Sequence, residues 1–158
     1  MNSIFFRNED EINALSFIRE SNRIEGINRR PIEKELIEYY RFMELPLITI
    51  ADLVQFVKVY QPDALLRDHS KVSNVRIGND IAPYSGVSIR IELDNIIHKA
   101  NKRYKKDAFD IHSQYETLHP FTDGNGRSGR MLWLWTMRRA PLGFLHHWYY
   151  QSLENSRK

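Results

Sequence analysis

Apolar residues recur at helical spacing along most of the chain. Over residues 9–23 they fall at positions 12, 15, 17 and 18, and Ile24 follows, which places Glu25 at a helix end. The same spacing, read with its flanking signals, predicts helices over about 9–23, 31–44, 49–60, 89–104, 107–119 and 126–139, and a last one beginning at Pro141. The sequence therefore predicts a mainly α fold, a bundle of about six to seven helices.

Local signals predict where several of these helices begin or end. Pro31 suits a first helical turn, and Pro46 stops the same helix. Thr49 is followed three residues later by Asp52, which is the spacing of a capping box. Asp107 is expected to cap the helix that leads to residue 119.

One segment, residues 73–83, has the pattern of a small β-hairpin. Short β-favouring runs flank Gly78 and Asn79, a pair that forms tight turns. Pro83 cannot donate to a strand ladder, so strand pairing is expected to end there. The predicted bundle therefore contains one hairpin between its third and fourth helices.

Length and composition indicate a single packed domain over residues 1–158. Of these residues, 42% are hydrophobic and 27% are charged, which is enough for one core but leaves no room for a second folded module. The chain has neither internal repeats nor a low-complexity linker. One core must therefore hold all the predicted helices.

The chain is basic, with a net charge of +3 and a pI near 9.2. Five basic residues cluster in one place, at Lys99, Lys102, Arg103, Lys105 and Lys106. Such a run is more often a solvated helix end than a surface for nucleic acid, so no nucleic-acid partner is predicted. The chain contains no cysteine, which excludes disulfides and cysteine-ligated zinc.

Targeting signals are missing from the sequence. No apolar stretch approaches the ~20 residues that cross a bilayer, and residues 1–7 lack the charged start and the apolar core of a signal peptide. The sequence therefore predicts a cytoplasmic protein without a membrane partner. Delivery into another cell and assembly into a homo-oligomer both stay open.

The densest chemistry lies in one segment, His119-Pro120-Phe121-Thr122-Asp123-Gly124-Asn125-Gly126-Arg127-Ser128-Gly129-Arg130. A residue before proline is pushed out of the α region, so His119 is expected at a helix end. Gly124 and Gly126 permit backbone conformations in which successive N–H groups turn inward and form an anion site. The next helix adds its positive N-terminal end to that site.

Charged residues of the segment indicate which anion would bind. Arg127 and Arg130 are three apart, so on a helix both lie on one face, and together they imply a polyphosphate. A carboxylate beside phosphate oxygens is repelled unless a divalent cation bridges them, so Asp123 is a candidate Mg²⁺ ligand. His119 is the candidate base, because imidazole titrates near pH ~6.5. The residues alone indicate phosphoryl or nucleotidyl transfer to a hydroxyl.

These features also have simpler interpretations. The turn around Asn125 could be a plain loop with solvated arginines. His119 and Asp123 could ligate a structural or hydrolytic metal, although zinc sites need three or four protein ligands and no third neighbour is evident. His112 lies on about the same helix face as His119 and is expected to be a packed or capping residue.

The segment from His119 to Arg130 resembles the signature of the Fic family, His-Pro-Phe-x-(Asp/Glu)-Gly-Asn-Gly-Arg-x-x-Arg, at every fixed position. The resemblance implies the Fic fold, with His119 as the base that deprotonates a Ser, Thr or Tyr hydroxyl of a target protein. That hydroxyl attacks the α-phosphate of ATP and leaves AMP on the target. The implied ligand roles are Mg²⁺ on Asp123, the α- and β-phosphates on Gly124, Asn125 and Gly126, and the β/γ end on Arg127 and Arg130.

Two details of the resemblance concern the nucleotide. Family members that transfer a phosphate have alanine and lysine in place of the two glycines, so Gly124 and Gly126 favour AMP transfer. Trp133, Trp135 and Trp148 are expected in the core, though one could line the adenine pocket.

A shorter motif lies far upstream. Ser21-Asn22-Arg23-Ile24-Glu25-Gly26 resembles the family's inhibitory motif, Ser/Thr-x-x-x-Glu-Gly/Asn. The resemblance implies that Glu25 pairs with Arg130, which occupies the arginine meant for the γ-phosphate and holds ATP in an unreactive pose. Residues 1–30 would then carry the inhibitory helix, and residues 31–158 the catalytic core and C-terminal helix. Alternatively, Glu25 is a surface carboxylate before a helix stop at Gly26.

The hairpin at 73–83 corresponds to the Fic flap, which by resemblance pairs with an extended stretch of the target protein, although it could also be only structural. Strand pairing uses main-chain groups, so it registers a peptide without fixing its identity. The sequence thus predicts a protein adenylyltransferase that uses ATP and Mg²⁺ and is restrained by Glu25. Two alternatives stay open: a Fic enzyme that removes AMP, and a nucleotide-responsive peptide-binding module with negligible turnover.

Overall fold

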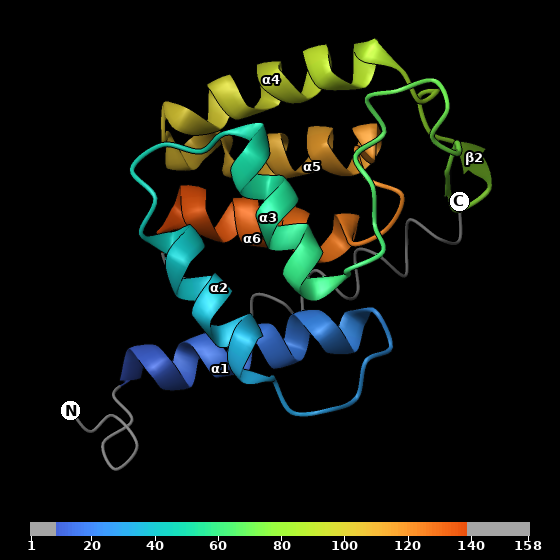
Figure 1. The fold of residues 1–158 in the computed structure, drawn as a ribbon. Coiled ribbons are helices and arrows are strands. Elements are labelled where there is room, and N and C mark those ends of the chain that lie inside the picture. Colours follow the sequence, from blue (N-terminus) through green and yellow to red (C-terminus); the bar gives the residue numbers. More distant parts are fainter. Residues whose placement is uncertain (1–8, 139–158) are drawn as a thin grey trace.

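The structure is a computed structural model that describes residues 9–138 (Figure 1). Its elements are α1 (Glu9–Ile24), α2 (Glu33–Met43), α3 (Ile50–Tyr60), β1 (Arg76–Ile77), β2 (Asp80–Ile81), α4 (Val87–Asn101), a 3-10 turn η1 (Lys105–Asp107), α5 (Ala108–Leu118) and α6 (Asn125–Met137). Over this part of the chain the fold is mainly α with one two-stranded hairpin, as the sequence predicts.

Helix α6 lies at the centre of the bundle. It contacts α1, α2, α3, α4 and α5, and Figure 1 shows it crossing the middle of the molecule between the α4–α5 layer and α1. A helix buried on all sides is apolar all round, and the run from Met131 to Trp135 meets that requirement. The N-terminal end of this central helix carries the 119–130 segment, so the core holds the motif in place.

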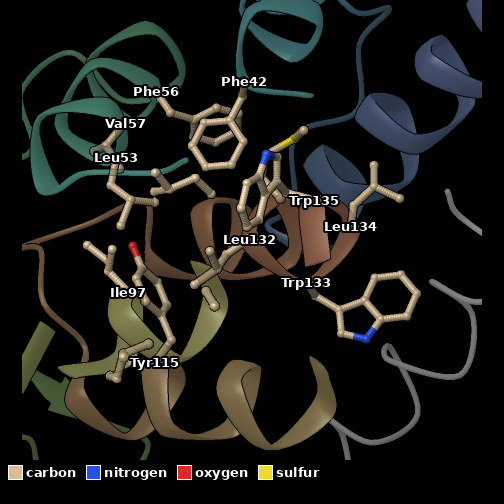
Figure 2. Packing of buried hydrophobic residues seen from close by; sticks show 14 of the residues in the cluster. Phe42, Leu53, Phe56, Val57, Ile97, Tyr115, Leu132, Trp133, Leu134 and Trp135 are labelled. Carbon is tan, nitrogen blue, oxygen red and sulfur yellow. The ribbon is translucent and has the colours of Figure 1, made fainter. Parts of the chain in front are cut away.

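The core packs against α6 from two directions (Figure 2). From α2 and α3, Phe42 and Phe56 meet edge to face with ring centroids 5.5 Å apart, beside Trp135. From α4 and α5, Ile97 and Tyr115 are buried against the same helix. Each such side chain contributes about 1.5–3 kcal/mol when it is fully buried, so the elements that carry the motif belong to one cooperative unit.

Helix α1 ends as predicted, but α2 does not begin as predicted. Gly26 adopts a left-handed φ of 80° and stops α1. Pro31 is not in the first turn of α2, because Ile32 is extended (φ −94°, ψ 158°) and the helix starts at Glu33. The Ile32 N–H donates to the Glu35 carboxylate (2.9 Å), and that bond sets the helix start.

The two predicted capping residues behave differently. At the start of α3, the Thr49 N–H donates to the Asp52 carboxylate (2.9 Å), and the Thr49 hydroxyl accepts from the Asp52 N–H (3.2 Å). This capping box is confirmed. Asp107 does precede α5, but its side chain makes no capping hydrogen bond, because η1 leads directly into the helix.

The predicted bounds of α4 and α6 are shifted by a few residues. Helix α4 starts at Val87, before the predicted 89, and stops at Asn101, before the predicted 104, because Arg103 turns to a φ of 57°. Helix α6 stops at Met137, before the predicted 139, where Arg138 adopts a φ of 77°. A residue in the left-handed region cannot continue a right-handed helix, so each helix ends before it.

Most of the basic cluster is solvated, as predicted. Four of its five members are exposed lysines, at positions 99, 102, 105 and 106. Arg103 is the exception, because its guanidinium lies 3.9 Å from the centre of the Trp135 ring and donates to the Leu45 carbonyl (2.7 Å). This arginine therefore joins the α2–α3 connection to the core.

The hairpin forms where the sequence predicts it. Arg76 pairs with Ile81 and Ile77 with Asp80, and Gly78 takes a positive φ of 60° in the turn. The Ala82 N–H still bonds the Val75 carbonyl (3.0 Å), and Pro83 comes next. Strand pairing therefore ends before Pro83, as expected for a residue without an N–H.

Two predictions fall on residues near the C-terminal end of the chain. The last helix, from Pro141, and Trp148 lie outside the described residues, whereas Trp133 and Trp135 are buried as predicted. None of the helices over residues 9–138 combines the length and apolar character needed to cross a bilayer.

Candidate functional site

Three distant segments meet at the N-terminal end of α6. Helix α5 ends at His119, residues 120–124 turn into α6, and the last turn of α1 lies against the first turn of α6. The contacts of Arg130 with Ser21 and Glu25 join residues more than 100 positions apart in the sequence. Ser21, Glu25, His119, Asp123, Gly124, Asn125, Gly126, Arg127 and Arg130, the candidate site residues from the sequence, all belong to these segments.

His119 sits at the end of α5, as the following proline predicts. Its backbone is left-handed (φ 51°, ψ 61°), and its N–H caps the helix on the Tyr115 carbonyl (2.9 Å). The ring Nδ1 lies 3.0 Å from the Glu116 carbonyl oxygen. A carbonyl only accepts, so Nδ1 carries the hydrogen and the Nε2 lone pair is the basic site of the neutral ring.

The surroundings of His119 favour the neutral ring. Burial lowers the pKa of His119 below its usual value, and the nearby positive charge of Arg67 acts in the same direction. The hydrogen bond to Glu116 and the carboxylates of Glu25 and Asp123 oppose this, but burial prevails. The imidazole is therefore unprotonated at neutral pH, as a general base must be.

The turn between His119 and α6 leads into the start of a helix, with Gly124 outside the helical conformation and Gly126 already within α6. Gly124 takes a left-handed φ of 77°, and its N–H bonds the Asp123 carboxylate (2.8 Å). A Cβ at Gly124 would also lie only 3.3 Å from the Val57 side chain, so both the backbone conformation and the limited space favour glycine here. The first N–H groups of a helix have no partner within the helix, and here they begin at Asn125.

Asn125 uses its side chain inside the protein. Its Oδ1 accepts from the Phe121 N–H (2.9 Å), its Nδ2 donates to the Phe121 carbonyl (2.8 Å), and only 3% of the residue is exposed. The resemblance assigns this residue to phosphate binding. In the structure the side-chain amide locks the turn, which leaves the backbone N–H as the group that can reach a phosphate.

Replacing Asn125 should therefore destabilise the fold. We expect Asn125→Ala to lower the free energy of unfolding by about 1–3 kcal/mol, because it strands a buried N–H and a buried carbonyl of Phe121. Urea denaturation measures this loss. Asn95→Ala is the matched control, since Asn95 is an exposed asparagine on α4; equal stability losses in the two variants would contradict the locking role.

Arg130 is bound by the last turn of α1. Its Nη2 donates to a Glu25 carboxylate oxygen (2.8 Å) and to the Ser21 carbonyl (3.0 Å), and its Nε donates to the Ser21 hydroxyl (2.9 Å). Arg130 is 5% exposed at its side chain, whereas Glu25 is 38% exposed. The two residues singled out in the upstream motif therefore converge on the second arginine of the downstream motif.

Arg127 is bound by two residues that sequence reasoning missed. It donates to the Gln61 side chain (2.7 Å) at the end of α3 and to the Asn22 side chain (3.4 Å) on α1. Asn22 is fully buried and also donates to Glu35 (3.2 Å), which Arg29 holds through two bonds. The first motif arginine is thus connected to α1, α2 and α3.

Gly126 lets Glu25 approach Arg130. A Cβ at position 126 would overlap the Glu25 carboxylate and come within 3.1 Å of Arg130 Nη1. Any side chain there would move Glu25 away from its partner, unless the α1 turn shifted. The bare Cα of Gly126 therefore forms one wall of the space that Glu25 occupies.

The remaining candidates lie apart from the turn. His112 is buried beside Gly129, and burial lowers its pKa to about 3, so it is a packed neutral residue as predicted. The Trp135 indole donates to the Leu45 carbonyl (2.9 Å), away from the anion site. Within residues 11–138 no three histidine or acidic side chains gather closely enough to hold a metal by themselves.

Comparison with protein-family models matches residues 48–137 to the Fic/DOC family. The match covers more than half of the 158 residues and contains both the 119–130 segment and the hairpin. The α1 segment that binds Arg130 lies outside it. Comparisons with curated proteins and with solved structures give no match.

Proposed function

The chain belongs to the Fic/DOC family, and on that basis we propose that it is a protein adenylyltransferase. It transfers AMP from ATP to a hydroxyl of a target protein. The observation that carries the proposal is the neutral imidazole of His119 next to a helix start that offers unpaired N–H groups.

The proposed reaction uses His119 as a general base. Nε2 accepts the proton of a Ser, Thr or Tyr hydroxyl as its oxygen forms a bond to the α-phosphorus of ATP. The bond from that phosphorus to the oxygen bridging to the β-phosphate breaks, and pyrophosphate leaves. The N–H groups at the start of α6 and the two motif arginines offset the negative charge of the phosphates.

Asp123 suits the proposed role of Mg²⁺ ligand. It is exposed, and its contact with the Gly124 N–H orients the carboxylate at the turn. Mg²⁺ in nucleotide sites takes one or two carboxylates and fills its other positions with phosphate oxygens and water, so one acidic residue is enough. When bound, the ion would offset phosphate charge.

The proposed target binds along the hairpin. Residues on both strands are exposed, and Ile81 and Tyr84 expose 55% and 69% of their surface. An extended peptide can add to an open strand edge through main-chain hydrogen bonds. This mode would present a hydroxyl near the α5–α6 turn without demanding one target sequence.

In the proposed resting state, both motif arginines are occupied by the protein itself. Arg130 is held by Ser21 and Glu25, and Arg127 by Asn22 and Gln61. A γ-phosphate would have to displace the Glu25 carboxylate from Arg130. We therefore propose that α1 restrains the reaction.

The label position in ATP tests the proposed reaction. With a Glu25→Gly variant and Mg²⁺, we expect label on the α-phosphate to reach protein and label on the γ-phosphate to appear only in pyrophosphate. Transfer of the γ label would show phosphate transfer and overturn the proposal. Release of AMP from a pre-labelled protein without attachment would favour the AMP-removing alternative, and ATP binding without either reaction would favour the binding module.

A further inference from the structure

Arg67 is a fully buried charged residue near the site. It lies in the segment between α3 and β1 and has no exposed surface. No ion pair with an acidic side chain holds it among residues 11–138. A buried charge is costly unless its hydrogen-bonding groups are satisfied, so its contacts explain why it is there.

One set of contacts lies at the end of α5. The Arg67 Nη2 donates to the Leu118 carbonyl (2.8 Å) and its Nε to the His119 carbonyl (2.7 Å). The last carbonyls of a helix lack partners in the helix and carry its negative pole, which favours a cation. The Arg67 backbone N–H adds a bond to the Pro120 carbonyl (2.8 Å). Arg67 thus bonds three consecutive carbonyls around the left-handed His119.

The other contacts lie at the base of the hairpin. The Arg67 Nη1 donates to the Pro83 carbonyl (2.7 Å) and the Ser85 hydroxyl (3.2 Å). Ser85 in turn donates to the Ser73 carbonyl (3.1 Å), and its N–H bonds the Asn74 side chain (2.8 Å). Arg67 is therefore connected to both ends of the hairpin.

We infer that Arg67 is a positioning residue that holds the His119 backbone and the base of the hairpin in one fixed arrangement. This inference rests on the proposed function, in which the hairpin presents a hydroxyl and His119 accepts its proton. One rigid planar guanidinium joins the two parts. A displacement of about 1 Å between the base and the hydroxyl is enough to lower the rate about 100-fold.

Lysine and methionine variants test the inference on the Glu25→Gly background. Arg67→Lys keeps the positive charge but offers one nitrogen in place of the planar guanidinium. Arg67→Met removes both the charge and the hydrogen-bond donors. For Arg67→Lys we expect ATP binding within about 3-fold of the parent and label transfer reduced about 10- to 100-fold. We also expect changed nitrogen NMR shifts of the His119 ring, because its bond to Glu116 depends on this backbone geometry. Transfer within twofold of the parent, or unchanged ring shifts, overturns the inference.

A hairpin-side variant covers the case in which the Arg67 variants do not fold. Ser85→Ala removes one contact of Arg67 and the link to Ser73, but leaves the bonds to the α5 carbonyls intact. We expect folded protein, unchanged ATP binding and label transfer reduced by about 2- to 10-fold. Unchanged transfer would show that Arg67 does not couple the hairpin to His119.

Failure of the inference and failure of the proposed function give different results. If the Glu25→Gly parent itself transfers no label, the proposed reaction is wrong. In that case the His119 ring shifts still show whether Arg67 positions the ring. If the parent is active and the Arg67 and Ser85 variants match it, only the role of Arg67 is wrong.

Discussion

Replacing Glu25 with glycine is expected to raise AMP transfer by about 5- to 150-fold, the usual range for a coupling between two sites. The reason is the contact between its carboxylate and Arg130 Nη2 at 2.8 Å. Without it, Arg130 can donate to the γ-phosphate, and a negative charge leaves the space where that phosphate belongs. Label transfer from α-labelled ATP to the protein itself and to a cell lysate measures the gain.

A charge-matched pair of variants isolates the contact. Glu25→Gln keeps the size of the side chain but removes its charge, so we expect activation between wild type and Glu25→Gly. Glu20→Gln makes the same charge change five residues earlier, on α1, where the Glu20 side chain is 44% exposed and lies 3.7 Å from the exposed Arg23 side chain. We expect Glu20→Gln to behave as wild type. Equal activation by the two glutamine variants would attribute the effect to the charge of α1 and not to the Arg130 contact.

Loss of the base is expected to have the opposite effect. On the Glu25→Gly background, His119→Ala should lower transfer about 100- to 10,000-fold, the contribution of a positioned general base. ATP binding should persist, because the proposed anion site consists of the α6 start and the two arginines. Calorimetry with ATP and label transfer, measured on the same samples, separate binding from reaction.

The left-handed backbone of His119 calls for a second substitution. At a φ of 51°, alanine is more strained than histidine, whereas asparagine tolerates this left-handed region well. His119→Asn should therefore fold like the parent and still lack activity, and His98→Ala on the exposed face of α4 should keep activity. An active asparagine variant would show that backbone strain, and not loss of a base, inactivates the alanine variant.

Much of the fold could be predicted because its signals are local. The capping box at Thr49, the glycine stop after α1 and the tight turn at Gly78 depend on residues a few positions apart, and each appears as expected. The start of α2 depends on a distant arrangement. Glu35 is oriented by Asn22 and Arg29 as well as by its own helix, so proline preference alone gave the wrong boundary.

The candidate site divides in the same way. The 119–130 segment is contiguous, so its spacing already placed the base, the turn and the two arginines together. Gln61 and Arg67 belong to no motif, and Asn22 occupies a variable position of the upstream motif. Only the packing of α1 and α3 around α6 brings them in. A motif position does not say whether an amide faces a ligand or its own backbone, so the bonds between the Asn125 side chain and Phe121 appear only in the structure.

The core residues of α1 limit how the proposed restraint on Arg130 could be relieved. Ala14 and Ile18 are fully buried and Phe17 is 5% exposed, so this helix is part of the shared core. Removing it, by proteolysis or by swinging it outward, would expose that apolar surface and unfold the bundle. If α1 restrains the reaction as proposed, a rotamer change in the half-exposed Glu25 side chain would free Arg130 without disturbing this core, and exposed side chains change rotamer within picoseconds to nanoseconds.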